Sequence, residues 1–143
     1  MTNPATAPET AAETRSVIIE REVPYPPEKI WRALTQPHLL AEWLMKNDFQ
    51  ATVGHRFDFR GDWGSVDCTV LEVEPHRTLS YSWVAMGLDS VVTWTLTPSA
   101  TGTRLRMEQA GFRPDQEQAY RGAQYGWTQF LAKLEQILAG IPA

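Results

Sequence analysis

The sequence lacks the residues and segments that several classes of protein require. Cys68 is the one cysteine among 143 residues, so no intrachain disulfide can form, which fits a reducing compartment. The three histidines, His38, His55 and His76, do not have the spacing of a metal site. No apolar run approaches the ~20 residues that cross a bilayer, and the chain does not start like a secretory signal. We therefore expect a cytoplasmic protein without a metal and without a membrane partner.

Positive charge and nucleotide-binding motifs are also scarce. The formal net charge is −4, whereas a nucleic-acid-binding domain needs a basic surface. Arginines do alternate, as Arg56/Arg60 and Arg104/Arg106, and we interpret them as a solvated sheet face. No glycine-rich phosphate loop, dinucleotide fingerprint or G-x-S-x-G nucleophile motif occurs. We expect no nucleic-acid partner and no cofactor, and the sequence identifies no catalytic residue.

The length predicts one domain with a short tail. A domain of this size buries about 68–70% of its unfolded surface, which is enough for a core without disulfides. Residues 1–15 are rich in Ala, Thr, Pro and Glu, a composition that cannot build a core. We predict a disordered N-terminal tail over residues 1–15 and a single domain over residues 16–143.

Periodicity after the tail predicts a strand, two short helices and further strands. Pro27 and Pro37 can each occupy the first position of a short helix, where the missing N–H costs nothing. After residue 48 apolar residues alternate with polar ones, as in strands joined by short turns. The alternation changes phase after Val70, which predicts a β-bulge that turns Glu72 outward.

The C-terminal part predicts one long helix. Asp115 is its expected N-cap, and an apolar stripe runs from Tyr120 to Leu138 at nearly helical period. Short connections between about six strands indicate an antiparallel sheet, and such a sheet curves through its own twist. The expected class is therefore α+β, with the long helix lying across the concave side of the sheet.

These segments, in this order, resemble the SRPBCC (START-like) superfamily. The nearest group is named after the activator of the ninety-kilodalton heat-shock chaperone ATPase. The segments of this chain resemble the C-terminal domain of that activator. The segments are EREVPYPPEKIWRALTQPHLLAEWL, VGHRFDFRG, VLEVEPHRTLSYSW, VTWTLTP, GTRLRMEQAGF and YGWTQFLAKL. The resemblance covers about residues 16–138 and implies a helix-grip fold that encloses a cavity. It does not fix a reaction, because the family includes hydrophobic-ligand carriers, cyclases, hydrolases and chaperone activators.

Aromatic residues are abundant, with six tryptophans, and most fall on the inner phase of the predicted strands and helices. Trp31 is expected to anchor the first short helix, whereas Trp43 is expected to wall the cavity at its mouth. Cys68 is expected to be a buried thiol. The candidate ligand-binding residues are Trp43, His55, Phe57, Phe59, Cys68, Tyr81, Trp83, Trp94, Met107, Gln109, Tyr120, Gln124 and Trp127. The alternative, that these side chains interlock as a dry core, stays open.

Three functions remain, in this order. The first is binding of a small, largely hydrophobic or aromatic molecule in an internal cavity. The second is a cyclase- or hydrolase-like enzyme acting on an aromatic or polyketide-like substrate, with Tyr81 and His55 as its polar groups. The third is stimulation of the chaperone ATPase, which ranks last because the chaperone-binding proteins of this kind are larger. Many proteins of this size form symmetric dimers, so a homodimer also stays open.

Overall fold

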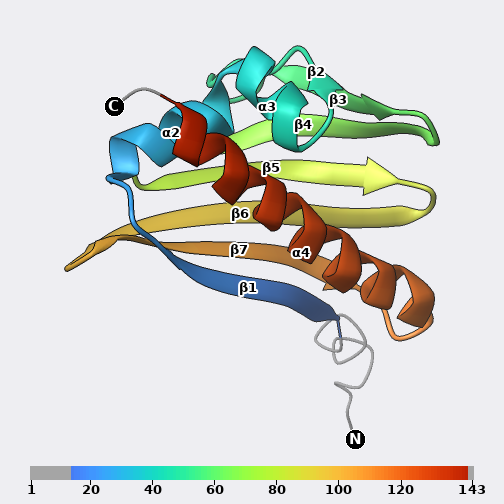
Figure 1. Cartoon of the computed structure of the whole chain (residues 1–143). Coiled ribbons are helices and arrows are strands. Elements are labelled where there is room, and N and C mark those ends of the chain that lie inside the picture. The colour runs from blue at the N-terminus through green and yellow to red at the C-terminus, as the bar shows by residue number, and fades with distance from the viewer. Residues whose placement is uncertain (1–13, 142–143) are drawn as a thin grey trace, which may run out of the picture.

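The computed structural model describes residues 14–141, which form one antiparallel sheet of seven strands and three helices (Figure 1). The strands are β1 (Arg15–Val23), β2 (Lys46–Asn47), β3 (Arg56–Gly61), β4 (Gly64–Glu74), β5 (Thr78–Ala85), β6 (Leu88–Ser99) and β7 (Gly102–Phe112). The helices are α2 (Pro27–Thr35), α3 (Pro37–Trp43) and α4 (Glu117–Gly140). The α+β class is confirmed, and the two-residue β2 adds a seventh strand to the predicted six. Residues 1–13 of the predicted tail lie outside the described residues. Arg15, its last residue, belongs to β1.

The sheet has the order β1-β7-β6-β5-β4-β3-β2. The first strand therefore pairs with the last, while every other pair joins strands that follow each other in sequence. Helix α4 crosses one face of this sheet diagonally (Figure 1). It begins near the turn between β5 and β6 and ends beside α2 and α3 (Figure 1).

Proline sets the bounds of the two short helices, as predicted. Pro27 and Pro37 each stand at the start of their helix. Gln36 lies between the helices and is extended, with φ −92° and ψ 122°, because the ring of Pro37 excludes the helical conformation before it. The chain can then turn sharply and place both helices at the same end of the sheet.

The predicted bulge in β4 is confirmed. The register against β5 shifts between Val70 and Glu72, so that Val70 pairs with Tyr81 and Val73 pairs with Leu79. Leu71 is the extra residue and is 46% exposed. Glu72 points to solvent, and Val73 returns to the inner side of the sheet. The arginines interpreted as a solvated face are exposed or half-exposed, and Arg104 and Arg106 form ion pairs with carboxylates of β1.

Helix α4 is 24 residues long and differs from the prediction at its start. Gln116 and not Asp115 is the N-cap residue, and no side chain caps the helix. Asp115 instead accepts a hydrogen bond from Nε of Arg113. Among the described residues, no helix is long and apolar enough to cross a membrane.

Candidate functional site

The centre of the space between α4 and the sheet is filled by aromatic rings. Trp94, which is fully buried, meets the rings of Trp43 and Trp127 edge-on, with both centroid distances 5.7 Å. Phe57 and Phe59 pack on Tyr81 at centroid distances of 5.7 and 5.9 Å. The dry-core alternative therefore describes this part of the molecule.

The polar atoms of these buried rings have partners, so the rings can pack together without leaving an N–H group unpaired. The indole N–H of Trp43 donates to the Ala33 carbonyl over 2.8 Å, and that of Trp94 donates to the Tyr81 hydroxyl over 3.0 Å. A satisfied indole is inexpensive to bury. Trp43 is 1% exposed and lies in the interior, so its expected place at the mouth of the sheet is corrected. Trp31 is buried as well, beside His76.

Tyr81, Cys68 and His55 do not come together at one cavity. Tyr81 is fully buried, and Cys68 lines a separate hollow on the sheet beside Arg56 and Asp67. Burial raises the pKa of the Tyr81 hydroxyl and that of the Cys68 thiol far above their ordinary values, so both groups stay neutral near pH 7. His55, just before the start of β3, stacks on Phe57, and its Nε2 donates to the carbonyl of Asp48 over 3.0 Å. In the described part of the chain, no three His, Cys, Asp or Glu side chains are arranged so that they could hold a metal ion.

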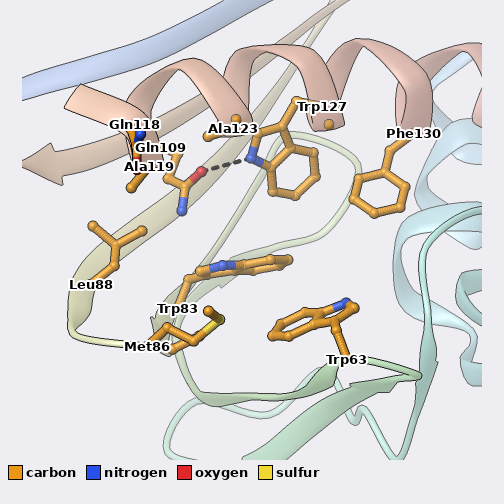
Figure 2. Close-up of a pocket in the computed structure, with 13 residues that line it drawn as sticks. Trp63, Trp83, Met86, Leu88, Gln109, Gln118, Ala119, Ala123, Trp127 and Phe130 are labelled. Atoms are coloured by element: carbon orange, nitrogen blue, oxygen red, sulfur yellow. Dashed lines mark hydrogen bonds between the residues drawn. The ribbon is translucent and has the colours of Figure 1, made fainter. Parts of the chain in front are cut away.

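A pocket of about 580 Å³ opens beneath the first half of α4 (Figure 2). It is bounded by α4, by the inner side of the sheet and by the β3–β4 and β5–β6 turns. The lining residues are Trp63, Trp83, Ala85, Met86, Leu88, Gln109, Gln118, Ala119, Gly122, Ala123, Gly126, Trp127 and Phe130. None of them carries a charge, so the pocket suits a neutral, largely apolar molecule.

Three of the predicted binding residues, Trp83, Gln109 and Trp127, meet in this pocket. The other candidates lie outside its lining, namely Trp43, His55, Phe57, Phe59, Cys68, Tyr81, Trp94, Met107, Tyr120 and Gln124. Most of these are core residues, but Gln124 is exposed on α4. Tyr120 is half-buried against Phe112, with the guanidinium of Arg15 over its ring.

Small residues on α4 create the space. Ala119, Gly122, Ala123 and Gly126 follow one another at helical spacing along the side of α4 that lines the pocket. A Cβ placed on Gly122 or Gly126 would meet no atom within 4 Å. Close packing therefore does not require glycine at either position. Each glycine inside a helix costs roughly 0.5–1 kcal/mol relative to alanine.

Two exposed side chains from the turns stand at the rim of the pocket. Trp63, in the turn between β3 and β4, is 56% exposed, and Met86, between β5 and β6, is 89% exposed. Met86 and Gly87 form a two-residue turn with φ 51° and 83°, a conformation that favours Asn-Gly over a long apolar residue. Neither Trp63 nor Met86 is among the predicted binding residues. The sequence does contain a signal for this pocket. It consists of a large apolar residue next to glycine in each turn, and of glycines inside the apolar stripe of the long helix.

Gln109 is the buried polar group of the pocket, with 1% exposure. Its Oε1 accepts a hydrogen bond of 2.7 Å from Nε1 of Trp127, and its Nε2 donates to the Ser90 hydroxyl over 3.0 Å. Ser90 in turn donates to the carbonyl of Trp83 over 2.8 Å. Figure 2 shows the amide oxygen turned to Trp127 and the amide nitrogen turned to the side of Trp83 and Leu88. The network ties α4 to β7, β6 and β5 around the pocket.

The chain is similar to several solved structures. Protein MLL2253 from Mesorhizobium loti is 60% identical, with a TM-score of 0.86 over 90% of this chain and 100% of that chain. CalU16 from Micromonospora echinospora is 29% identical, with a TM-score of 0.77 over 87% of this chain and 76% of that one. BH1534 from Bacillus halodurans is 27% identical, with a TM-score of 0.78 over 87% of this chain and 96% of that one.

Among curated proteins, none matches this sequence. The family described as activator of Hsp90 ATPase homolog 1-like protein matches residues 24–139, which is most of the chain. The seven-stranded sheet and the long C-terminal helix agree with the helix-grip structures above. The resemblance seen in the sequence is confirmed, and the chain belongs to the activator of Hsp90 ATPase homolog 1-like family within the SRPBCC superfamily.

Proposed function

We propose that this protein binds a small, uncharged, largely aromatic or apolar molecule in the pocket beneath the first half of α4. The observation that carries the proposal is the lining: none of its 13 residues is charged, and only Gln109 and Gln118 have polar side chains apart from the tryptophan N–H groups. The volume of about 580 Å³ lies within the range of ligand pockets, roughly 300–1,000 Å³.

The residues around the pocket are unfavourable for stability, which supports a functional role. Two helix glycines keep the space open without a steric need for glycine. Met86 adopts a left-handed conformation and exposes an apolar side chain. Departures of this kind from the locally favoured residue collect at functional sites, where binding compensates for them.

A pair of leucine substitutions on α4 tests the proposal. Ala123→Leu puts three more carbons into the pocket, whereas Ala132→Leu makes the same change at an exposed position of the same helix. We expect planar aromatic probes such as 9-fluorenone to shift the tryptophan indole N–H signals of wild type and Ala132→Leu in ¹H–¹⁵N spectra. Ala123→Leu should weaken binding at least tenfold. Equal binding by both variants, or no binding by wild type, would reject the pocket as the site.

The enzyme hypothesis has less support. Tyr81 and His55, its expected polar groups, do not line the pocket. The lining contains no side chain that titrates near neutral pH, so it offers no acid or base for proton transfer. Turnover that survives both Tyr81→Phe and His55→Ala would remove these two residues from any catalytic role.

Stimulation of the chaperone ATPase is the function that the family name suggests, and we rank it below ligand binding. The feature that distinguishes this molecule is a concave apolar pocket, whereas a protein partner needs roughly 800 Å² of complementary surface on each side. The ATPase rate of a ninety-kilodalton chaperone, measured with and without this protein, tests the idea. Sedimentation of the free protein tests the homodimer.

A further inference from the structure

The hydrogen bonds around Gln109 run in one direction and fix how its amide lies. An indole N–H can only donate, so the Gln109 atom that meets Trp127 must be the oxygen. The nitrogen then faces Ser90. Because the Ser90 hydroxyl donates to the Trp83 carbonyl, it accepts from Gln109. The amide therefore cannot flip without losing two buried hydrogen bonds.

This fixed orientation leaves a donor without a partner. The amide nitrogen of Gln109 carries two hydrogens, and Ser90 is its one partner among the described residues. Gln109 is 1% exposed and lines the pocket. A buried donor that stays unpaired costs about 1–3 kcal/mol. A ligand with a hydrogen-bond acceptor at this point would therefore bind more tightly than one without.

Trp83 supplies a second donor in the same lining. Its side chain is largely buried, at 9% exposure. Its Nε1–H has no hydrogen-bond partner among the described residues, unlike the indoles of Trp43, Trp94 and Trp127. Trp31, which lies away from the pocket, also has no N–H partner among these residues, but the ring of Trp83 faces the pocket, where a ligand can reach it (Figure 2).

We infer, resting on the proposed function, that the ligand is a flat ring system bearing an uncharged acceptor such as a ketone oxygen. Gln109 recognises this acceptor through its free Nε2–H, assisted by the N–H of Trp83. The aromatic lining favours flat rings. It contains no carboxylate to balance a cationic ligand and no cation to balance an anionic one. Gln109 is thus a specificity-determining residue of the pocket.

Two probes that differ only in the acceptor test this inference. 9-Fluorenone and fluorene share one tricyclic skeleton, but only fluorenone has a carbonyl oxygen. One neutral hydrogen bond gained in a buried site corresponds to roughly a five- to tenfold preference. We expect wild type to bind fluorenone tighter than fluorene by this factor in calorimetric titrations. Fluorenone should move the side-chain amide signal of Gln109 further downfield than fluorene does, because only fluorenone can accept its hydrogen bond.

Gln109→Glu removes the free donor with little change of shape. Burial keeps a glutamic acid neutral, and the neutral acid can still accept from Trp127 and donate to Ser90. Residue 109 then has no second donor for the ligand, and only the assisting N–H of Trp83 remains. We expect this variant to lose most of the preference for fluorenone and to bind both probes about as wild type binds fluorene. Gln124→Glu makes the same change at an exposed position outside the lining and should keep the preference for fluorenone.

The outcomes separate the inference from the function on which it rests. If wild type binds both probes equally, the acceptor inference is overturned while the pocket remains a binding site. If neither probe binds, the proposed function fails, and the inference fails with it. The amide signal of Gln109 is read in wild type, so the test stands even if Gln109→Glu does not fold. A fluorenone preference with an unmoved Gln109 signal would assign recognition to another residue and overturn the inference.

Discussion

The two halves of α4 face the same sheet but pack against it in different ways. In the second half, Leu131, Leu134 and Leu138 are at most 1% exposed and close the core beside α2 and α3. In the first half, before Trp127, the side that faces the pocket carries alanine and glycine apart from Gln118. One helix therefore serves two purposes. Its second half stabilises the fold by filling space, and its first half leaves space for a ligand.

The contacts that hold the first half lie mostly at the surface. The Arg15 guanidinium binds Glu117, Nε2 of Gln116 donates to the Gly87 carbonyl, and Tyr120 packs on Phe112. Exposed ion pairs contribute little to stability. Apolar burial contributes about 25 cal/mol per Å², and it is concentrated at the other end of the helix. We expect the two halves to differ in local stability.

The largest expected effect separates a core tryptophan from a pocket tryptophan. Trp94→Ala opens a cavity in packed interior and should lower the free energy of unfolding by about 3–5 kcal/mol. Trp63→Ala, at a position 56% exposed, should change it by about 0.5 kcal/mol or less, yet weaken binding of 9-fluorenone. Urea unfolding followed by circular dichroism measures both variants. If both variants lower the free energy of unfolding by a similar amount, Trp63 is part of the core.

Hydrogen exchange compares the two halves of α4 directly. Amides of residues 119–126 should exchange at least tenfold faster than amides of residues 131–138, because opening the first half exposes little buried apolar surface. Saturation with 9-fluorenone should slow only the first half. Uniform exchange along α4 in the free protein would contradict the proposed difference.

The fold was largely predictable because its signals are local. Pro27 and Pro37 place two helix starts, and the change of phase after Val70 marks the bulge. Strand β2 was missed since Lys46–Asn47 is too short to show any period. Asp115 is not the N-cap of α4, although aspartate is a favoured residue at N-cap positions. Residue type alone does not decide which turn geometry the chain adopts before a helix.

The site was predictable only in part. Alternation shows which side chains point inward, and it found Trp83, Gln109 and Trp127. It cannot show where the inward side chains fail to fill the space, because that depends on packing between segments far apart in sequence. The interior around Trp94 is filled, whereas the end under Gly122 and Gly126 is open. Most predicted residues therefore belong to the core.

Replacing the two pocket glycines should strengthen the fold and weaken the site. Gly122→Ala and Gly126→Ala each add a methyl group in open space and should raise the free energy of unfolding by roughly 0.5–1 kcal/mol. The added methyl groups take up pocket volume, so the double variant should bind 9-fluorenone less tightly than wild type. Gly140→Ala, at the far end of α4 and outside the pocket lining, is the control for binding. Destabilisation by the double variant would show that these glycines serve packing.

The smallest expected effect concerns the ion pair that ties the first half of α4 to β1. Hydrogen bonds from Arg15, and then from Arg121, lower the pKa of Glu117. A lowered folded pKa contributes stability that is present above the unfolded value of 4.5 and is lost as the pH falls through the folded pKa. Glu117→Gln should therefore speed hydrogen exchange in the first half of α4 slightly at pH 7, and the difference from wild type should shrink on acidification and in 1 M salt.

Glu135→Gln is the matched control, because it removes the ion pair with Arg21 in the second half of α4. It should leave hydrogen exchange of the second half unchanged, because buried leucines hold that half. An equal response of both halves would mean that surface pairs, and not buried packing, set the stability of α4.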